Sequence, residues 1–173
     1  SGQTFASDPS GTATITPAAI TAITNTGTAV TLQANTDITL AASSDIVSNN
    51  PGGNGGAITL QAGRSVLLNS SITSDNGNLT IVANETAVNG VVNVNRDPGA
   101  AVIAMAPGTT INAGSGSIMI TLNNGAGLAD STSGNITLPP GIEGTFFVHV
   151  ETNIGGTTAR VRFPDNGSSR SYF

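Results

Sequence analysis

Short runs of alternating apolar and polar residues recur along the chain, most regularly between residues 29 and 86. Residues 29–34 (AVTLQA) return as residues 57–62 (AITLQA), an offset of 28 residues. A weaker copy, residues 78–83 (NLTIVA), follows 21 residues later. Period-2 alternation indicates short strands with one buried face, and self-similarity at such a period is typical of a solenoid.

Two further apolar triplets follow each copy of the opening run. Residues 38–40 (ITL) correspond to residues 66–68 (VLL), and residues 45–47 (DIV) correspond to residues 71–73 (SIT). Gly and Asn between the triplets tolerate the left-handed backbone of tight corners. Residues 49–56 (NNPGGNGG) form a loop insertion in the first copy. The pattern predicts an all-β chain, a right-handed parallel β-helix of about five turns with three short strands per turn.

The repeats divide the chain into three parts. Residues 1–28 are an N-terminal tail and incoming strand, with a weak strand at 12–16, a short irregular turn at 18–23 in spite of some helical character, and no obvious cap. Residues 29–138 are the parallel β-helix repeats, in which residues 88–94 (VNGVVNV) continue the alternation. Residues 139–173 are a C-terminal aromatic hairpin, acting as a cap or a docking segment.

The C-terminal part differs from the repeats in its aromatic content. Residues 145–151 and 158–163 alternate, and a Gly-containing segment at 153–156 separates them, which predicts a β-hairpin. A solenoid needs its end covered, because a last turn exposes backbone groups and apolar side chains. The candidate partner-binding residues are Phe146, Phe147, His149, Phe163, Tyr172 and Phe173.

Charge is sparse and acidic. Only 9% of the residues are charged, the net charge is −5, and all five basic residues are arginine. We therefore expect no nucleic-acid partner. No apolar run approaches the roughly 18 residues of a membrane span, so we expect no membrane insertion. The chain has no cysteine, which suits, without requiring, a protein that crosses membranes unfolded.

Candidate chemistry is thin. One histidine, no lysine and no cysteine leave few general acids, bases or nucleophiles. The glycine-rich loop lacks the tandem Asp of calcium-binding repeats. We assign no catalytic residue, cofactor or metal, and expect that the protein is not an enzyme. A polysaccharide-active β-helix enzyme is a remote alternative, because acids one turn apart, such as Asp45 and Asp75, could approach each other.

Threonine fills the outward position of many apolar-Thr-apolar triplets. Stacked on one face, these residues would make a flat hydroxyl and methyl surface. The simplest reading is the β-propensity of threonine on a solvent face, and the alternatives are ice binding or glycan contact. The residues are Thr31, Thr39, Thr59, Thr80, Thr121 and Thr137.

Three of these runs carry a family resemblance. Residues 58–63 (ITLQAG), 71–74 (SITS) and 77–81 (GNLTI) resemble the repeats of filamentous-haemagglutinin-type exoproteins, the adhesins exported by two-partner secretion. The match covers residues 29–95, and residues 100–138 more loosely. The secretion-domain motifs of the family are missing, so the chain resembles an internal or C-terminal piece. The resemblance implies a secreted or bacterial cell-surface location and an adhesin-like stalk.

Two functions follow from these observations. The first is an extracellular structural and adhesive module that binds a host or neighbour-cell surface glycan or protein. The second is the subunit of an extracellular filament, which binds copies of itself end to end. The resemblance favours the first, whereas the aromatic C-terminus and the lack of an N-terminal cap favour the second.

Overall fold

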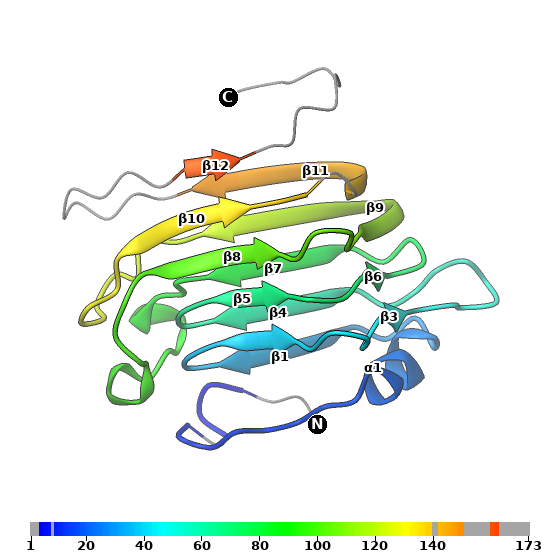
Figure 1. Cartoon of the computed structure of the whole chain (residues 1–173). Coiled ribbons are helices and arrows are strands. Elements are labelled where there is room, and N and C mark those ends of the chain that lie inside the picture. Colours follow the sequence, from blue (N-terminus) through cyan, green and yellow to red (C-terminus); the bar gives the residue numbers. More distant parts are fainter. Residues whose placement is uncertain (1–3, 8, 140–141, 151–159, 163–173) are drawn as a thin grey trace.

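The computed structural model describes residues 4–7, 9–139, 142–150 and 160–162. Their strands form two parallel sheets, here called sheet A and sheet B (Figure 1). The described residues are all-β with parallel sheets, as the sequence predicts, apart from one short α-helix and two 3-10 turns. Sheet A contains β1 (Val30–Ala34), β3 (Ile46–Val47), β4 (Ile58–Ala62), β6 (Ile72–Thr73), β7 (Leu79–Ala83), β9 (Ile111–Leu122) and β11 (Ile142–Val150). Sheet B contains β2 (Ile38–Leu40), β5 (Val66–Leu68), β8 (Ala101–Met105), β10 (Ser133–Thr137) and β12 (Arg160–Arg162).

The repeats stack in the register that their sequences predict. Val30 pairs with Ile58 and Ala34 with Ala62, so the 28-residue offset is one circuit of the chain. Ile58 pairs with Leu79, which confirms the 21-residue offset. The second and third triplets also stack on their counterparts, β2 on β5 and β3 on β6.

Each circuit visits sheet A, then sheet B, then sheet A again. The long strand β9 joins the two parts of sheet A, because its start pairs with β6 and its end pairs with β7. Sheet A therefore curls round, and sheet B faces it across one core (Figure 1). The connections between strands differ in length, and their additional residues form loops outside the two sheets.

The core consists of columns of aliphatic side chains, one residue from each strand. Ile58, Leu79 and Ile118 form one such column, and each is at most 2% exposed. In sheet B, Val66, Ile103 and Ile136 form another and are fully buried. A core this thin needs no aromatic residues, which explains their scarcity in the repeats.

The N-terminal end of the stack is covered, contrary to the prediction. Residues 17–24 form helix α1 (Pro17–Thr24) instead of an irregular turn, and residues 12–16 form no strand. Thr16 caps the helix by accepting a hydrogen bond at Oγ1 from Ala19 N–H (3.2 Å), and Pro17 lies in the first turn. Ile20 of α1 packs into the core with Val30 and Ile46. These start signals outweigh the low helix propensity of Thr and Ile.

The predicted C-terminal β-hairpin is also wrong. Strand β11 pairs with β9 and strand β12 pairs with β10, each in parallel and in different sheets. The two strands therefore continue the stack as its last circuit. Alternation alone does not distinguish an antiparallel hairpin from two strands of one circuit.

Residues 88–94 do not continue the strands either. Residues 88–89 and 93–94 lie in two 3-10 turns, Ala87–Asn89 and Asn93–Asn95, and the residues between the turns form no strand. Val88 and Val94 are 89% and 87% exposed. Residues 49–56 form a loop, as predicted. No helix of the described residues has the length and apolar character that crossing a membrane requires.

We predict that stability depends on the buried columns and not on the exposed valines. Replacing Ile103 with Ala should lower the free energy of unfolding by about 2–5 kcal/mol, because the neighbouring circuits fix the cavity walls. Replacing Val88 with Ala should change it by less than about 0.5 kcal/mol. Chemical denaturation measures both, and equal losses would contradict the core described here.

Candidate functional site

A groove of about 610 Å³ lies at the N-terminal end of sheet B. The residues that line it come from three segments: Thr4, residues 9–13 and Ile15; residues 34–39; and Val94, Asn95 and Asp97. Its volume falls within the range of ligand pockets, about 300–1,000 Å³. Three segments that are distant in sequence therefore meet around one open space.

Asn35 holds two of these segments in place. It is 6% exposed, and its Nδ2 donates to Phe5 O (2.8 Å) and Pro9 O (3.0 Å). Its Oδ1 accepts from Val92 N–H (2.8 Å). One buried amide thus joins the N-terminal segment to the loop that follows β7.

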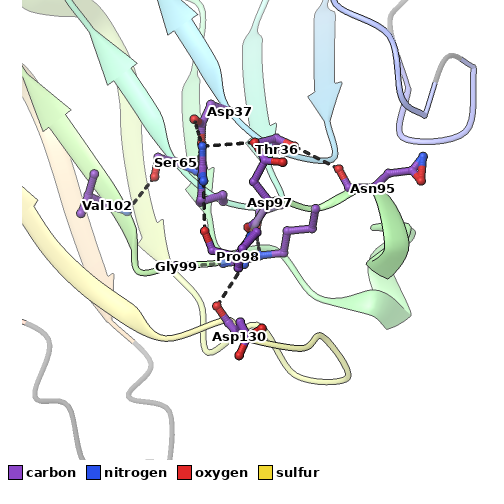
Figure 2. A network of polar contacts seen from close by, with 12 residues as sticks. Thr36, Asp37, Ser65, Asn95, Asp97, Pro98, Gly99, Val102 and Asp130 are labelled. Atoms are coloured by element: carbon purple, nitrogen blue, oxygen red, sulfur yellow. Dashed lines mark hydrogen bonds and ion pairs between the residues drawn. The ribbon is translucent and has the colours of Figure 1, made fainter.

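Asp37, which lines the groove, forms an ion pair with Arg64, and Figure 2 shows Asp37 among the polar contacts of this corner. Arg64 donates from Nε to Asp37 Oδ1 (2.9 Å) and from Nη2 to Asp37 Oδ2 (2.7 Å). Asp37 Oδ1 also accepts from Ser65 N–H (2.9 Å), and Asp97 lies 3.5 Å from Arg64. The bidentate geometry fixes the corner more firmly than a single ion pair would.

These contacts shift both pKa values. Partial burial by itself raises the pKa of Asp37, but the hydrogen bonds from Arg64 and from Ser65 N–H outweigh it and leave that pKa below its usual value. The hydrogen bond to Asp37 raises the pKa of Arg64. Both groups therefore stay charged at neutral pH.

A second arginine, Arg96, donates hydrogen bonds to backbone carbonyl groups near the groove. Arg96 is 7% exposed, and its guanidinium donates to the carbonyl oxygens of Gly63 (2.7 Å), Asp97 (2.8 Å), Asp130 (3.2 Å) and Gly99 (3.2 Å) and to Asn84 Oδ1 (3.1 Å). Burial, and then the charge of Arg64, lower the pKa of Arg96. The oxygens that accept these hydrogen bonds come from corners of several circuits, so Arg96 holds the loop at residues 84–100 against the stack.

Strand β2, which lines the groove with Ile38 and Thr39, has an open edge. Ile38 N–H donates to Ser65 O (2.9 Å), and Leu40 O accepts from Asn69 N–H (3.0 Å), so both residues bond towards β5. Backbone groups alternate sides along a parallel strand, so the N–H and C=O of Thr39 point the other way, towards the groove. No strand of the described residues pairs with this edge of β2.

The candidate residues from the sequence lie at the other end of the stack. Phe146, Phe147 and His149 are on β11, where Phe147 pairs with Met119 and is 52% exposed. Phe146 continues the inward column after Ile118 and is 39% exposed. Phe163, Tyr172 and Phe173 lie outside the described residues. The structure therefore places three of the six on one strand.

Sequence reasoning missed the groove residues Asp37, Asn95 and Asp97. The sequence did contain one signal for the ion pair between Asp37 and Arg64. Arg64 lies 27 residues after Asp37, close to the 28-residue offset of the repeat. That spacing puts the two at the same corner of adjacent circuits. No repeat spacing predicts where the loop at residues 84–100 lies, because the hydrogen bonds of Arg96 and Asn35 determine its position.

The groove offers hydroxyl, amide, carboxylate and backbone groups for binding. Within the described part of the chain, no three His, Cys, Asp or Glu side chains gather into a metal-binding group. Asp45 and Asp75 each accept a backbone N–H from a neighbouring circuit, that of Ser71 (2.8 Å) and of Asn50 (2.6 Å). These carboxylates brace loops and corners.

Comparison with known proteins found no matching family model, no matching curated protein and no matching solved structure.

The Asp37 carboxylate should make stability depend on pH. Because its pKa is lower in the folded chain than in the unfolded chain, the unfolded state binds more protons in acid. The stabilisation is therefore complete above the unfolded pKa of about 3.9 and is lost as pH falls through the folded pKa. Denaturation at a series of pH values should show the difference between wild type and Asp37→Asn shrinking below about pH 4.

Asp130→Asn is the matched control, because Arg96 bonds the backbone carbonyl of Asp130, which is an exposed residue. A difference between wild type and Asp37→Asn that stays constant down to pH 2 would contradict the role given to this carboxylate.

Arg96 should be essential for the loop 84–100. Arg96→Met leaves several buried oxygens without a donor, at about 1–3 kcal/mol for each, so we expect a loss of several kcal/mol. Val94→Met places the same side chain on an exposed position of the same loop and should be nearly neutral. Denaturation, with limited proteolysis of the loop, separates the two variants. Equal protection of the loop in both would show that Arg96 does not hold it.

Proposed function

We propose that the chain is a right-handed parallel β-helix that serves as an extracellular, non-catalytic structural and adhesive module. The observation that carries this proposal is the in-register parallel stack, in which every described strand pairs with the strand one circuit away. Such a frame presents long lateral faces and needs no bulky core.

The order of the strands supports the coil. Successive strands enter sheet A, sheet B and sheet A before the pattern repeats, and all pairs are parallel. Crossovers between parallel strands of one sheet are right-handed in about 98% of cases, which favours a right-handed coil.

The use of the acidic residues supports a non-catalytic role. Asp37, Asp45 and Asp75 accept backbone N–H groups of neighbouring circuits, and Glu85, which is 2% exposed, accepts from Thr86 N–H, Asn89 and Asn123. Glycoside-cleaving sites need a pair of carboxylates that face a shared substrate position. Here these carboxylates are engaged in holding circuits and loops together.

The outer face of sheet A supports adhesion to a polar surface. Thr31, Thr59 and Thr80 stack in register, and beside them Gln33 Nε2 donates to Gln61 Oε1 (2.8 Å). This row contains three threonines and not all six of the candidates, because Met119 and Phe147 occupy the next two positions after Thr80. Thr121 lies in the glutamine row, and Thr39 and Thr137 lie in sheet B, separated by Leu67 and Ala104. Hydroxyl and amide groups spaced by about 4.8 Å suit the hydroxyls of a surface glycan.

The resemblance to filamentous-haemagglutinin-type repeats supports a secreted or bacterial cell-surface location. In that setting the partner is a glycan on a host or neighbouring cell. The few charges and the polar, uncharged faces agree with binding by hydrogen bonds more than by ion pairs.

A glycan array probed with the labelled protein tests this function. We expect saturable binding to one glycan class, and at least about tenfold weaker binding by the triple variant Thr31→Val, Thr59→Val, Thr80→Val, which keeps the β-branched shape but removes the hydroxyls. Thr137→Val on sheet B is the control and should bind as wild type does. Turnover of any arrayed polysaccharide, or no binding to glycans or cells, would overturn the proposal.

A further inference from the structure

Arg96 is a buried cation whose hydrogen-bond acceptors are all neutral. Its guanidinium N–H groups donate to four backbone carbonyl oxygens and to one side-chain amide oxygen, and no carboxylate of the described residues is among these acceptors. The residue is 7% exposed. Burying a charge that contacts no opposite charge costs free energy. A carboxylate formed in place of one of these carbonyl groups would therefore be stabilised.

One of the four carbonyl groups belongs to the peptide bond between Asp97 and Pro98. Arg96 Nη1 donates to Asp97 O (2.8 Å), and Arg64 Nη1 donates to Pro98 O (3.1 Å), so both residues of this bond are held by a guanidinium group (Figure 2). Asp97, Pro98 and the two residues after them are exposed, so water reaches the bond.

A peptide bond between Asp and Pro has an internal route to cleavage. The carboxylate can attack the carbonyl carbon of its own residue and form a cyclic anhydride, because the two groups belong to one residue and need no encounter. The leaving nitrogen is a tertiary amide, which takes up a proton more readily than other peptide nitrogens. The Asp97 side chain is 63% exposed and lies 3.5 Å from Arg64, whereas Asp37 accepts two hydrogen bonds from that arginine. The Asp97 carboxylate is therefore held less firmly.

The position of Arg96 favours both the transition state and the product of this reaction. The attack places negative charge on Asp97 O, the atom to which Arg96 Nη1 already donates, and a donor at such an oxygen stabilises the transition state. Hydrolysis of the anhydride would leave a carboxylate on the same carbon. Arg96 would then contact an opposite charge in place of a neutral carbonyl group, and charge-assisted hydrogen bonds are the stronger ones.

We propose that the chain cleaves itself once between Asp97 and Pro98, with Asp97 as the nucleophile and Arg96 as the donor to the oxyanion. The bond from Asp97 C to Pro98 N breaks, its electron pair stays on the nitrogen, and the nitrogen takes a proton from solvent. Water then opens the anhydride, returns protons to solvent and leaves the side-chain and backbone carboxylates of Asp97. The overall change is the addition of one water molecule, and no other reactant is consumed.

The cut leaves the stack intact. The bond lies in the loop at residues 84–100, and strands that precede it pair with strands that follow it, β5 with β8 and both β6 and β7 with β9. The cut gives a free end to the segment that carries the groove residues Val94, Asn95 and Asp97. This inference goes beyond the adhesive function proposed above and does not depend on it.

Three variants separate the nucleophile from the charge around it. Asp97→Ala removes the carboxylate and keeps the backbone carbonyl that Arg96 contacts, so it should stay intact. Asp97→Glu keeps the charge beside Arg64 but would have to close a larger ring, and it should be cut at least about tenfold more slowly. Asp130→Asn is the control, because Arg96 contacts the backbone carbonyl of this exposed residue and not its carboxylate, and it should be cut as wild type is.

Mass spectrometry of the purified chain, incubated with protease inhibitors at mildly acidic and neutral pH, follows the cut. We expect one fragment that ends at Asp97 and one that begins at Pro98, with masses that add up to the chain plus one water. The folded chain should be cut at least about tenfold faster than the same chain unfolded in urea, where Arg96 is not held at the bond. Size-exclusion chromatography without denaturant should elute both fragments together.

A wild-type chain that stays intact would overturn the proposal. Equal rates in the folded and the urea-unfolded chain would overturn it as well, because they would show the ordinary acid lability of the bond. Cleavage of Asp97→Ala at the wild-type rate would do the same, because it would show the action of a contaminating protease. The comparison with urea uses only the wild-type chain, so it decides the role of the fold even if a variant is unstable.

Discussion

Backbone hydrogen bonding between successive circuits is the constraint on which the rest of this structure depends. Each strand is only two to twelve residues long, and an isolated strand of this length has no stability of its own. Pairing one circuit with the next in register satisfies the backbone and aligns like with like, so that Ile58 lies on Leu79 and Thr59 on Thr80. A slip of one residue would turn every apolar side chain outward, which is why the aliphatic columns enforce the register.

Because of the same constraint, the stacked strands repeat from one circuit to the next, whereas the loops between them differ. Circuits differ in length, and the additional residues leave the frame at corners, as in residues 49–56 and 84–100. Corner side chains then bond to the backbone of the next circuit, as Asp45 does to Ser71 N–H and Asn78 to Ser117 N–H. Charged residues are only 9% of the chain, and several of them make corner contacts of this kind.

The candidate groove is a product of these loops and not of the frame. Asn35 and Arg96 draw the N-terminal segment and the loop 84–100 to the corner beside β2, and the space between them is the groove. Because helix α1 packs on sheet A, the edge of sheet B is the part of this end that remains accessible in the described residues. The lateral faces and the strand edge are thus two separate surfaces, one polar and regular and the other shaped by loops.

The sequence by itself determined the parallel stacking, the register of the first three circuits and the loop at residues 49–56, because period-2 alternation at a fixed offset leaves few other arrangements. It also contained the Asp37–Arg64 pair as a near-repeat spacing. Only the tertiary structure decided that residues 17–24 are helical, that β11 and β12 enter different sheets, and that residues 88–94 leave the stack. The physical reason is that these outcomes depend on contacts between distant segments, such as Ile20 with the core and Arg96 with four carbonyl oxygens, which no local pattern records.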